Sequence, residues 1–288
     1  MSLRWTDSPD PDRLGALLAA VRAADGQPDG TGTELLREYQ GGEHLELLAG
    51  DTLVGYAHVA PDGDAFGNAV VELLVHPEHR RAGHGGELVS AVLEHIDGPA
   101  RFWSHANHPA AAALATRFGL RKVRELLKMR AEVQDWPEPK WPEGVHVRTF
   151  RPGADEAGMV AVNARAFDWH PEQGRLTVSD VVATEREAWF DPEGFFLAVD
   201  DQDEPVGFHW TKIHPDGVGE VYVVGVDPAA QGGGLGRALT AVGLRHLRAA
   251  GAPAVILYVE SDNKAALRLY RALGFVEESV GVQYATSG

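Results

Sequence analysis

Residues 219–237 read GEVYVVGVDPAAQGGGLGR, and this stretch decides the fold. A β-rich apolar run leads through Asp-Pro into a glycine-rich turn, and the run 235–250 predicts a helix directly after it. Glycines let a backbone approach a ligand closely, and the free N–H groups that begin a helix favour an anion. The spacing matches neither G-x-x-x-x-G-K-[ST] nor G-x-G-x-x-G. The turn is therefore either a phosphate site of another type or a plain tight connection.

A second copy of this pattern occurs earlier in the chain. Residues 71–86 read VELLVHPEHRRAGHGG, and Pro77, Gly83 and Gly85 precede Pro228, Gly234 and Gly236 by a constant 151 positions. Downstream, residues 107–120 (NHPAAAALATRFGL) resemble residues 263–275 (NKAALRLYRALGF). A period this long indicates duplicated domains, because solenoid repeats are only about 20–50 residues long.

The joint between the copies is predicted near residues 134–144, QDWPEPKWPEG, whose three prolines disfavour a helix and suit an extended linker. We therefore predict an N-terminal domain at 1–137, a Pro-rich linker at 138–145 and a C-terminal domain at 146–288. The alternative is a surface loop within one domain.

Hydrophobic periodicity predicts helices and strands in the same order in both halves. The predicted helices are 12–24, 85–95, 155–166, 235–250 and 264–273. The predicted strands are two within 45–59, then 70–75, 195–199, 206–212, 220–226 and 255–259. Such alternation indicates an α/β class in which helices cover a sheet.

Composition excludes several classes of function. The 26 basic and 42 acidic residues give a net charge of −16, which argues against a nucleic-acid partner. There is no cysteine, so disulfides and thiolate metal sites are excluded. The chain has neither an apolar run of about 20 residues nor a signal-like start. We expect a cytoplasmic monomer with no membrane partner.

The loop and its downstream echo resemble the GNAT acetyltransferase superfamily, which implies two tandem GNAT domains, each a mixed sheet flanked by helices. HPEQG (170–174), GFHWTKIHP (207–215) and LYVESDN (257–263) extend this similarity to tandem GNAT enzymes of actinobacteria. The resemblance implies acetyl-CoA as donor and, as acceptor, the cysteinyl amine of the small molecule cysteinyl-glucosaminyl-inositol.

The resemblance also implies which residues contact the donor. In the C-terminal half these are Val224, Gly225, Val226, Gln231, Gly232, Gly233, Gly234, Leu235, Gly236, Arg237, Asn263, Lys264, Ala265, Ala266, Leu267 and Arg268. In the N-terminal half, where a second and unreactive acetyl-CoA is expected, they are Leu73, Leu74, Val75, Arg81, Ala82, Gly83, His84, Gly85 and Gly86. The alternative for the N-terminal loop is a vestige that holds no ligand.

Acetyl transfer to an amine needs a base for the ammonium and benefits from an acid for the leaving thiolate. Glu220 begins the strand that would contact the donor, and Tyr270 lies two helical turns after Asn263 on one helix face. The resemblance implies that Glu220 is the base and Tyr270 the acid. The alternatives are a solvated strand-end Glu and a core tyrosine. Ala115 aligns with Tyr270, so we predict that the N-terminal half is not catalytic.

Acceptor contacts are also carried over from the resemblance. They are Glu34, Glu172, Lys212, Glu220 and Tyr258. Glu34 requires a shift, because the ungapped match falls on Thr33, and a surface charge is the alternative for Glu172 and Lys212. His170, His209 and His214 do not have the H-E-x-x-H spacing of a zinc site, so we expect no metal. Two further functions stay open: acetylation of another amine, and non-enzymatic acetyl-CoA binding.

Overall fold

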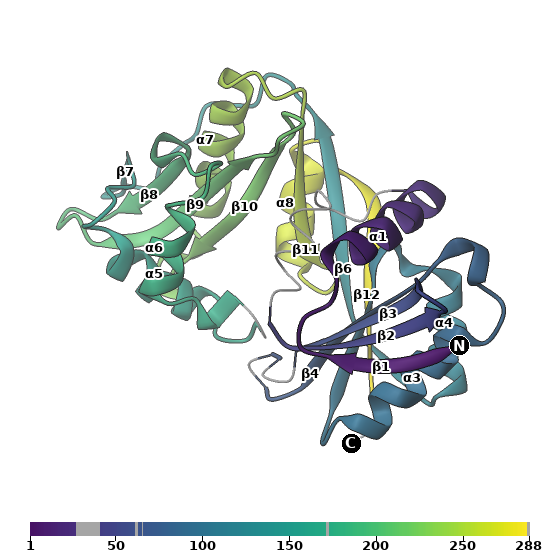
Figure 1. Ribbon diagram of the computed structural model, residues 1–288. Coiled ribbons are helices and arrows are strands. Elements are labelled where there is room, and N and C mark those ends of the chain that lie inside the picture. The colour runs from purple at the N-terminus through teal and green to yellow at the C-terminus, as the bar shows by residue number, and fades with distance from the viewer. Residues whose placement is uncertain (27–40, 61–62, 65, 171–172, 287–288) are drawn as a thin grey trace. The chain divides into compact units, whose positions relative to one another are not determined.

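The computed structural model describes residues 1–26, 41–60, 63–64, 66–170 and 173–286. The chain forms two compact units (Figure 1). The first unit comprises Met1–Glu125 with Val280–Gly288, and the second comprises Leu126–Ser279. The boundaries of these units differ from those of the predicted domains, 1–137 and 146–288, which a linker at 138–145 would join. Residues 126–137 lie in the second unit and residues 280–288 in the first.

The sheet of the first unit has the order β1-β2-β3-β4-β5-β12. Its elements are β1 (Ser2–Thr6), α1 (Pro11–Asp25), β2 (Glu43–Ala49), β3 (Thr52–Ala60), β4 (Ala69–Val75), η1 (Pro77–His79), α3 (His84–His95), β5 (Ala100–Ser104), η2 (His105–Asn107), α4 (Pro109–Arg117) and the end of β12 (Val276–Ala285). The pair β4–β5 is parallel, and β12 pairs antiparallel with β5 through residues 282–285.

The sheet of the second unit has the order β6-β11-β10-β9-β8-β7. Its elements are β6 (Arg121–Glu132, from Leu126 onward), β7 (His146–Thr149), α5 (Glu156–Ala166), η3 (Gln173–Arg175), α6 (Val178–Thr184), η4 (Pro192–Gly194), β8 (Phe195–Val199), β9 (Pro205–Ile213), β10 (Gly219–Val226), η5 (Pro228–Ala230), α7 (Leu235–Ala249), β11 (Ala254–Glu260) and α8 (Lys264–Ala272). Here β10–β11 is the parallel pair.

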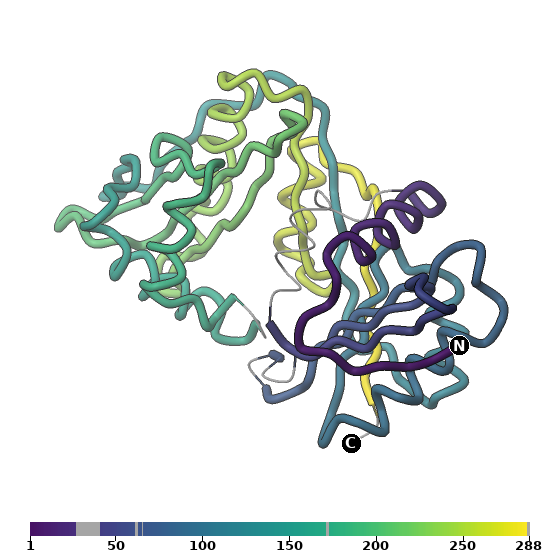
Figure 2. The backbone as a smooth tube through the Cα atoms, viewed as in Figure 1, coloured from purple at the N-terminus to yellow at the C-terminus, as the bar shows by residue number. Residues whose placement is uncertain are grey.

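Each unit is completed by a strand that follows the other copy of the repeat. β6 comes after the first copy and pairs with β11 of the second unit, from Glu132↔Ala254 to Leu126↔Glu260. β12 comes after the second copy, and Figure 2 traces this yellow end of the chain into the first unit. The two halves of the sequence therefore exchange their last strands.

Helices cover the second sheet on opposite faces (Figure 1). A Cβ at Gly219 would meet Leu247 of α7, whereas one at Gly225 would meet Phe167, which follows α5. Leu235 and Leu239 of α7 are buried, as are Met159 and Val162 of α5. The sheet is therefore buried on both faces, as the continuous apolar runs of β8 and β10 predict.

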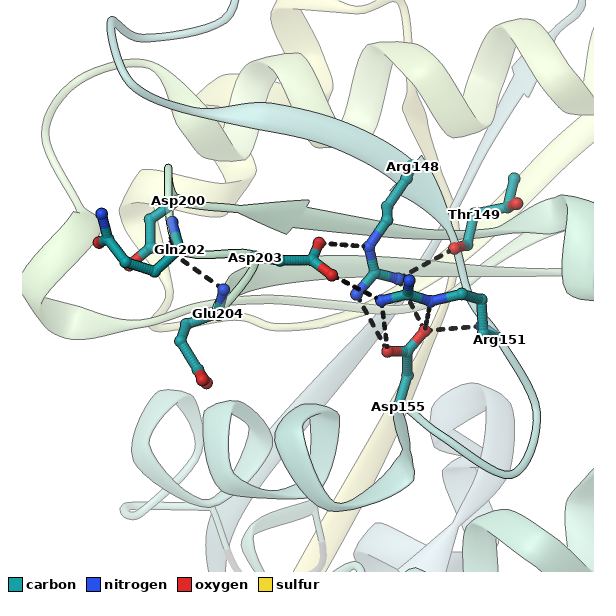
Figure 3. A network of polar contacts seen from close by, with 8 residues as sticks. All are labelled: Arg148, Thr149, Arg151, Asp155, Asp200, Gln202, Asp203 and Glu204. Carbon is teal, nitrogen blue, oxygen red and sulfur yellow. Dashed lines mark hydrogen bonds and ion pairs between the residues drawn. The ribbon is translucent and has the colours of Figure 1, made fainter.

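An ion-pair network fixes β7 against the start of α5 (Figure 3). The Arg148 guanidinium donates to Asp155 at 2.7 and 3.0 Å and to Asp203 at 2.7 Å, and Arg151 contacts the same two carboxylates. Burial pushes the pKa of Asp155 upward, but the hydrogen bonds from Arg148 and Arg151 outweigh it and hold that pKa below its usual value. The network therefore stabilises the charged carboxylate.

Candidate functional site

The parallel strands of the second unit part soon after they pair. β10 and β11 are in register only from Gly219↔Val255 to Val221↔Leu257, although both strands continue. The ladder between β10 and β9 shifts its register between Val221 and Val223, which leaves Tyr222 as a bulge. Bulges increase local twist and end pairing. Val224, Gly225 and Val226 lie beyond this register, so the edge of β10 that they form toward β11 could bind an extended amide chain.

The glycine-rich turn begins α7 with free backbone donors. Gly234 is the N-cap residue of α7, with φ of +86° and no side-chain cap. Gly232 also has a positive φ, +96°, and a Cβ at either glycine would meet nothing within 4 Å. Backbone conformation rather than space therefore requires glycine here. Exposed, uncapped N–H groups of this kind can bind a phosphate group, so the phosphate site stays a prediction.

The turn of the first unit is built in the same way. Gly83, with φ of +95°, is the uncapped N-cap residue of α3. Arg80 Nε donates to Val75 O at 3.1 Å, and at the matching place Gln231 Nε2 donates to Val226 O at 3.3 Å. Arg80 also donates two 2.7 Å hydrogen bonds to Asp25, which hold the pKa of that carboxyl below its usual value.

Glu220 lies on the α5 side of β10, since its neighbour Gly219 faces α7. Only 7% of Glu220 is exposed, and its Oε2 lies 2.7 Å from Nε2 of His214. Lys212 is its direct partner in the antiparallel ladder with β9. The Lys212 ammonium lies 5.0 Å from the Trp189 ring centroid and 5.7 Å from that of Tyr222. A buried carboxylate with a histidine partner thus sits directly before the bulge.

Tyr270 lies in the last turn of α8 and is 9% exposed. Burial raises the pKa of its hydroxyl to about 12. At neutral pH the group is therefore protonated and able to donate a hydrogen bond. Asn263 caps the start of this helix by accepting from the Ala266 N–H at 3.1 Å.

The matching helix of the first unit carries alanine where α8 carries tyrosine. Both α4 and α8 have nine residues, and Ala115 and Tyr270 are each the seventh. Each accepts the same terminal bond, from Leu120 N at 2.8 Å and from Phe275 N at 3.0 Å. The structural alignment therefore agrees with the alignment of the two sequences.

Of the residues predicted to contact the acceptor, Lys212, Glu220 and Tyr258 lie in the part of the chain that the structure describes. Tyr258 is two residues beyond Ile256, the parallel partner of Glu220, so these side chains project from one face of the sheet. Glu34 and Glu172 lie outside the described residues. The sequence pattern did not indicate the pairing of His214 with Glu220. The tight turn HPDG after β9 was the signal that could have placed His214 two residues beyond Lys212 on this face.

The remaining histidines occupy other surroundings. His170 Nε2 lies 3.8 Å from Glu260 Oε1, and His209 Nδ1 lies 2.6 Å from Leu239 O under α7. Burial lowers the pKa of His209 to about 4, so its ring is neutral. Across the described ranges, no three or more His, Asp or Glu side chains come together as a metal site would require. In the same ranges no helix has the length and apolar character to cross a bilayer.

Comparison with known proteins agrees with this geometry. The sequence matches the acetyltransferase (GNAT) family at residues 16–120 and 163–275. Mycothiol acetyltransferase of Saccharomonospora viridis is 54% identical, with 98% of this chain and 97% of that protein covered. Its counterpart from Amycolatopsis mediterranei is 54% identical over 93% and 92% of the two chains.

Solved structures share this fold over nearly the whole chain. A GCN5-related N-acetyltransferase from Sphaerobacter thermophilus has a TM-score of 0.77 at 28% identity, with 99% of this chain and 95% of that one covered. A tandem GNAT protein from the clavulanic acid biosynthesis pathway shares the fold, with a TM-score of 0.75 at 18% identity and coverage of 99% and 98%. The chain therefore belongs to the acetyltransferase (GNAT) family, as a tandem member of its mycothiol acetyltransferase group.

Proposed function

We propose that this acetyltransferase moves the acetyl group of acetyl-CoA to the cysteinyl amine of cysteinyl-glucosaminyl-inositol, giving mycothiol and CoA, and that the second unit performs the reaction. The observation that supports this assignment most strongly is the buried Glu220 carboxylate directly before the point where β10 and β11 part. Acetyl-CoA supplies an acyl group already activated as a thioester.

The donor is proposed to bind where backbone groups are free. The exposed turn at residues 231–237 would hold the diphosphate through the N–H groups that begin α7. Backbone groups of Val224, Gly225 and Val226 would hold the pantetheine arm and the thioester carbonyl. Residues 263–268, at the start of α8, would flank the other side of the donor.

Two side chains are proposed to move protons. Glu220 takes a proton from the acceptor ammonium, because only the neutral amine attacks a thioester. The Tyr270 hydroxyl, held protonated by burial, donates to the departing sulfur. Lys212 and Tyr258 share the Glu220 face of the sheet and would bind the polyhydroxylated acceptor, with Glu172 as a further predicted contact.

The first unit is proposed to hold a second acetyl-CoA that is not consumed. Its turn keeps the uncapped helix start and the left-handed glycine Gly83, which supports binding, whereas Ala115 offers no hydroxyl. Calorimetric titration with acetyl-CoA is expected to give two sites per chain. A stoichiometry of one would contradict this second site.

The product identifies the reaction. The purified protein is incubated with acetyl-CoA and cysteinyl-glucosaminyl-inositol, and the product is analysed by mass spectrometry and thiol titration. Transfer to nitrogen adds one acetyl group and leaves the cysteine thiol reactive, whereas transfer to sulfur removes that thiol. Turnover of other amines without turnover of this acceptor would contradict the proposed substrate.

A further inference from the structure

His214 is held rigidly beside Glu220 by the turn that joins β9 to β10. The His214 N–H donates to Val218 O at 2.9 Å, and Gly217 N–H donates back to His214 O at 2.8 Å. Asp216 braces the same turn by accepting from Val218 N–H at 3.0 Å. The backbone position of His214 is thus fixed at the end of the hairpin that carries Lys212 and Glu220.

The His214 ring engages one of the two oxygens of the Glu220 carboxylate. Nε2 lies 2.7 Å from Oε2, and the side chains of His214 and Glu220 are 19% and 9% exposed. The hydrogen bond orients the carboxylate and leaves Oε1 for another partner. His214 is the more exposed member of the pair, so it provides the route from the carboxylate to water.

We propose that His214 is the positioning residue of Glu220 and carries away the proton that Glu220 collects. This inference rests on the proposed function of Glu220 as base. A buried carboxylic acid must lose its proton before it can act again, and histidine is the side chain whose usual pKa suits this exchange near neutral pH.

The proton balance is simple. An N–H bond of the acceptor ammonium breaks, its electron pair stays on nitrogen, and an O–H bond forms on Glu220. In the resting pair the Nε2–H of neutral His214 donates to the carboxylate, so the ring first exchanges this hydrogen through water for one on Nδ1. The carboxyl group then delivers its proton to the bare Nε2, which restores the carboxylate and forms an imidazolium. The imidazolium releases a proton to water, so the pair returns to its initial state with no other reactant.

Several other titratable groups lie on this face of the sheet, and their ionisation also affects how the rate varies with pH. β9 contributes Lys212, β10 contributes Tyr222, and β11 contributes Tyr258 and Glu260. Asp216 lies in the connecting turn, and His170 lies against Glu260. A variant of His214 must therefore be compared with a matched histidine elsewhere.

His146 is the matched control, because its Nε2 also meets a carboxylate, Asp201 Oδ1 at 3.0 Å, at an exposed site on β7. The test compares His214→Gln, His214→Ala and His146→Gln in kcat and in acceptor KM from pH 6 to 9. Glutamine can still donate to Glu220 but cannot accept its proton. We expect kcat of His214→Gln to fall roughly tenfold with acceptor KM unchanged, less than the ~10²–10⁴-fold typical of a base itself.

Added imidazole separates proton removal from structural support. It is expected to raise kcat of His214→Ala in proportion to its concentration and to leave the wild type and His146→Gln unchanged. Wild-type kcat in His214→Gln would overturn the proton role, as would a loss in His214→Ala that imidazole does not restore.

The pairing itself can be measured without the acceptor. In the folded protein, the His214 ¹⁵N resonances are expected to move in Glu220→Gln, whereas those of His146 stay in place. Unmoved His214 resonances would overturn the inference. If the wild type fails to acetylate the acceptor while this shift is present, the proposed function fails and the His214–Glu220 pair stands.

Discussion

The two units share a backbone design and differ in the residues that could do chemistry. In the second unit the β9–β10 ladder contains a bulge, whereas the β3–β4 ladder runs from Gly55↔Val75 to Ala60↔Val70 without a register shift. The parallel ladders begin at Gly219↔Val255 in the second unit and at Ala69↔Ala100 in the first. Counted from these pairs, Glu220 corresponds to Val70. The partner of Val70 is Ala60, where the second unit has Lys212. One inserted residue, Tyr222, therefore accompanies Glu220 and Lys212, the residues that the first unit lacks.

The first turns of α3 and α7 differ as well. In the first unit a Cβ at Gly86 would lie 2.8 Å from Nη1 of Arg117, so that guanidinium lies over the first turn of α3. The residue of α7 that aligns with Gly86 is Arg237, and it is exposed. The duplicated fold thus keeps a glycine turn with an uncapped helix start in both units, and the units differ in a few side chains around it.

The largest effect is expected from matched glycine variants. Gly234→Val and Gly83→Val impose the same left-handed strain, because both residues have φ near +90° and open space around Cβ. Gly234→Val should abolish turnover, because the proposed diphosphate turn would be distorted, whereas Gly83→Val should retain it within about twofold. Steady-state kinetics with circular dichroism as a folding control checks this. An active Gly234→Val beside a folded but inactive Gly83→Val would assign catalysis to the first unit.

Glu220→Gln should show the next largest loss. It keeps the size of the side chain and removes the base, so we expect a fall of about 10²–10³-fold in kcat near pH 6.5. The rate should partly recover as pH rises, because more of the substrate amine is then already neutral. Kinetics between pH 6 and 9 measures the trend, with Glu72→Gln in β4 as the control. A loss independent of pH would leave Glu220 a binding role only.

Tyr270→Phe should lower kcat by about 10²-fold, the lower end for an acid, because CoA thiolate is a fair leaving group. Acetyl-CoA affinity should stay nearly unchanged, since the ring and its packing are kept. Because the Tyr270 pKa is about 12, its ionisation should not affect the wild-type rate below about pH 10. Tyr284→Phe in β12 is the control, and wild-type kcat in Tyr270→Phe would remove Tyr270 from the mechanism.

The smallest effect concerns stability and asks whether the units unfold separately. Asp155→Asn should cost about 2 kcal/mol, because charged hydrogen bonds to Arg148 and Arg151 are lost. The pKa of Asp155 is lowered in the folded protein, so its contribution is present above the ordinary carboxyl pKa near 4 and is lost as pH falls through the folded value. The difference from wild type should therefore shrink as pH falls below about 4.

Thermal unfolding at pH 7 and pH 3 measures this difference, with the exposed Asp201→Asn as the control. A separate transition that shifts alone would show that the second unit unfolds independently. An Asp155→Asn protein as stable as the wild type at pH 7 would contradict the stabilising role of the network.

The local elements were predictable because hydrophobic periodicity records them. The predictions for 12–24, 195–199 and 255–259 are confirmed as α1, β8 and β11. β6 was not predicted, although buried Leu127, Met129 and Ala131 alternate with less buried residues. Alternation alone does not say which strand will pair with which, so the exchange of β6 and β12 could not be read from the sequence.

The candidate site was predictable in its residue types but not in its contacts. The duplication and the glycine spacing pointed to the turn, and Ala115 opposite Tyr270 distinguished the halves. The bulge at Tyr222 depends on the register between β9 and β10, which a single strand does not specify. The contact of His214 with Glu220 follows from that register and from the turn between them.

The exchanged strands impose an order on biosynthesis. β5 in the first unit pairs with β4 but lacks its second partner, β12, until residues 282–285 have been made, although residues 1–125 leave the ribosome much earlier. During that interval β5 is an open sheet edge, a site where other chains can add. The N-terminal unit, which would ordinarily fold first during synthesis, can therefore reach its final form only after the second unit has been translated.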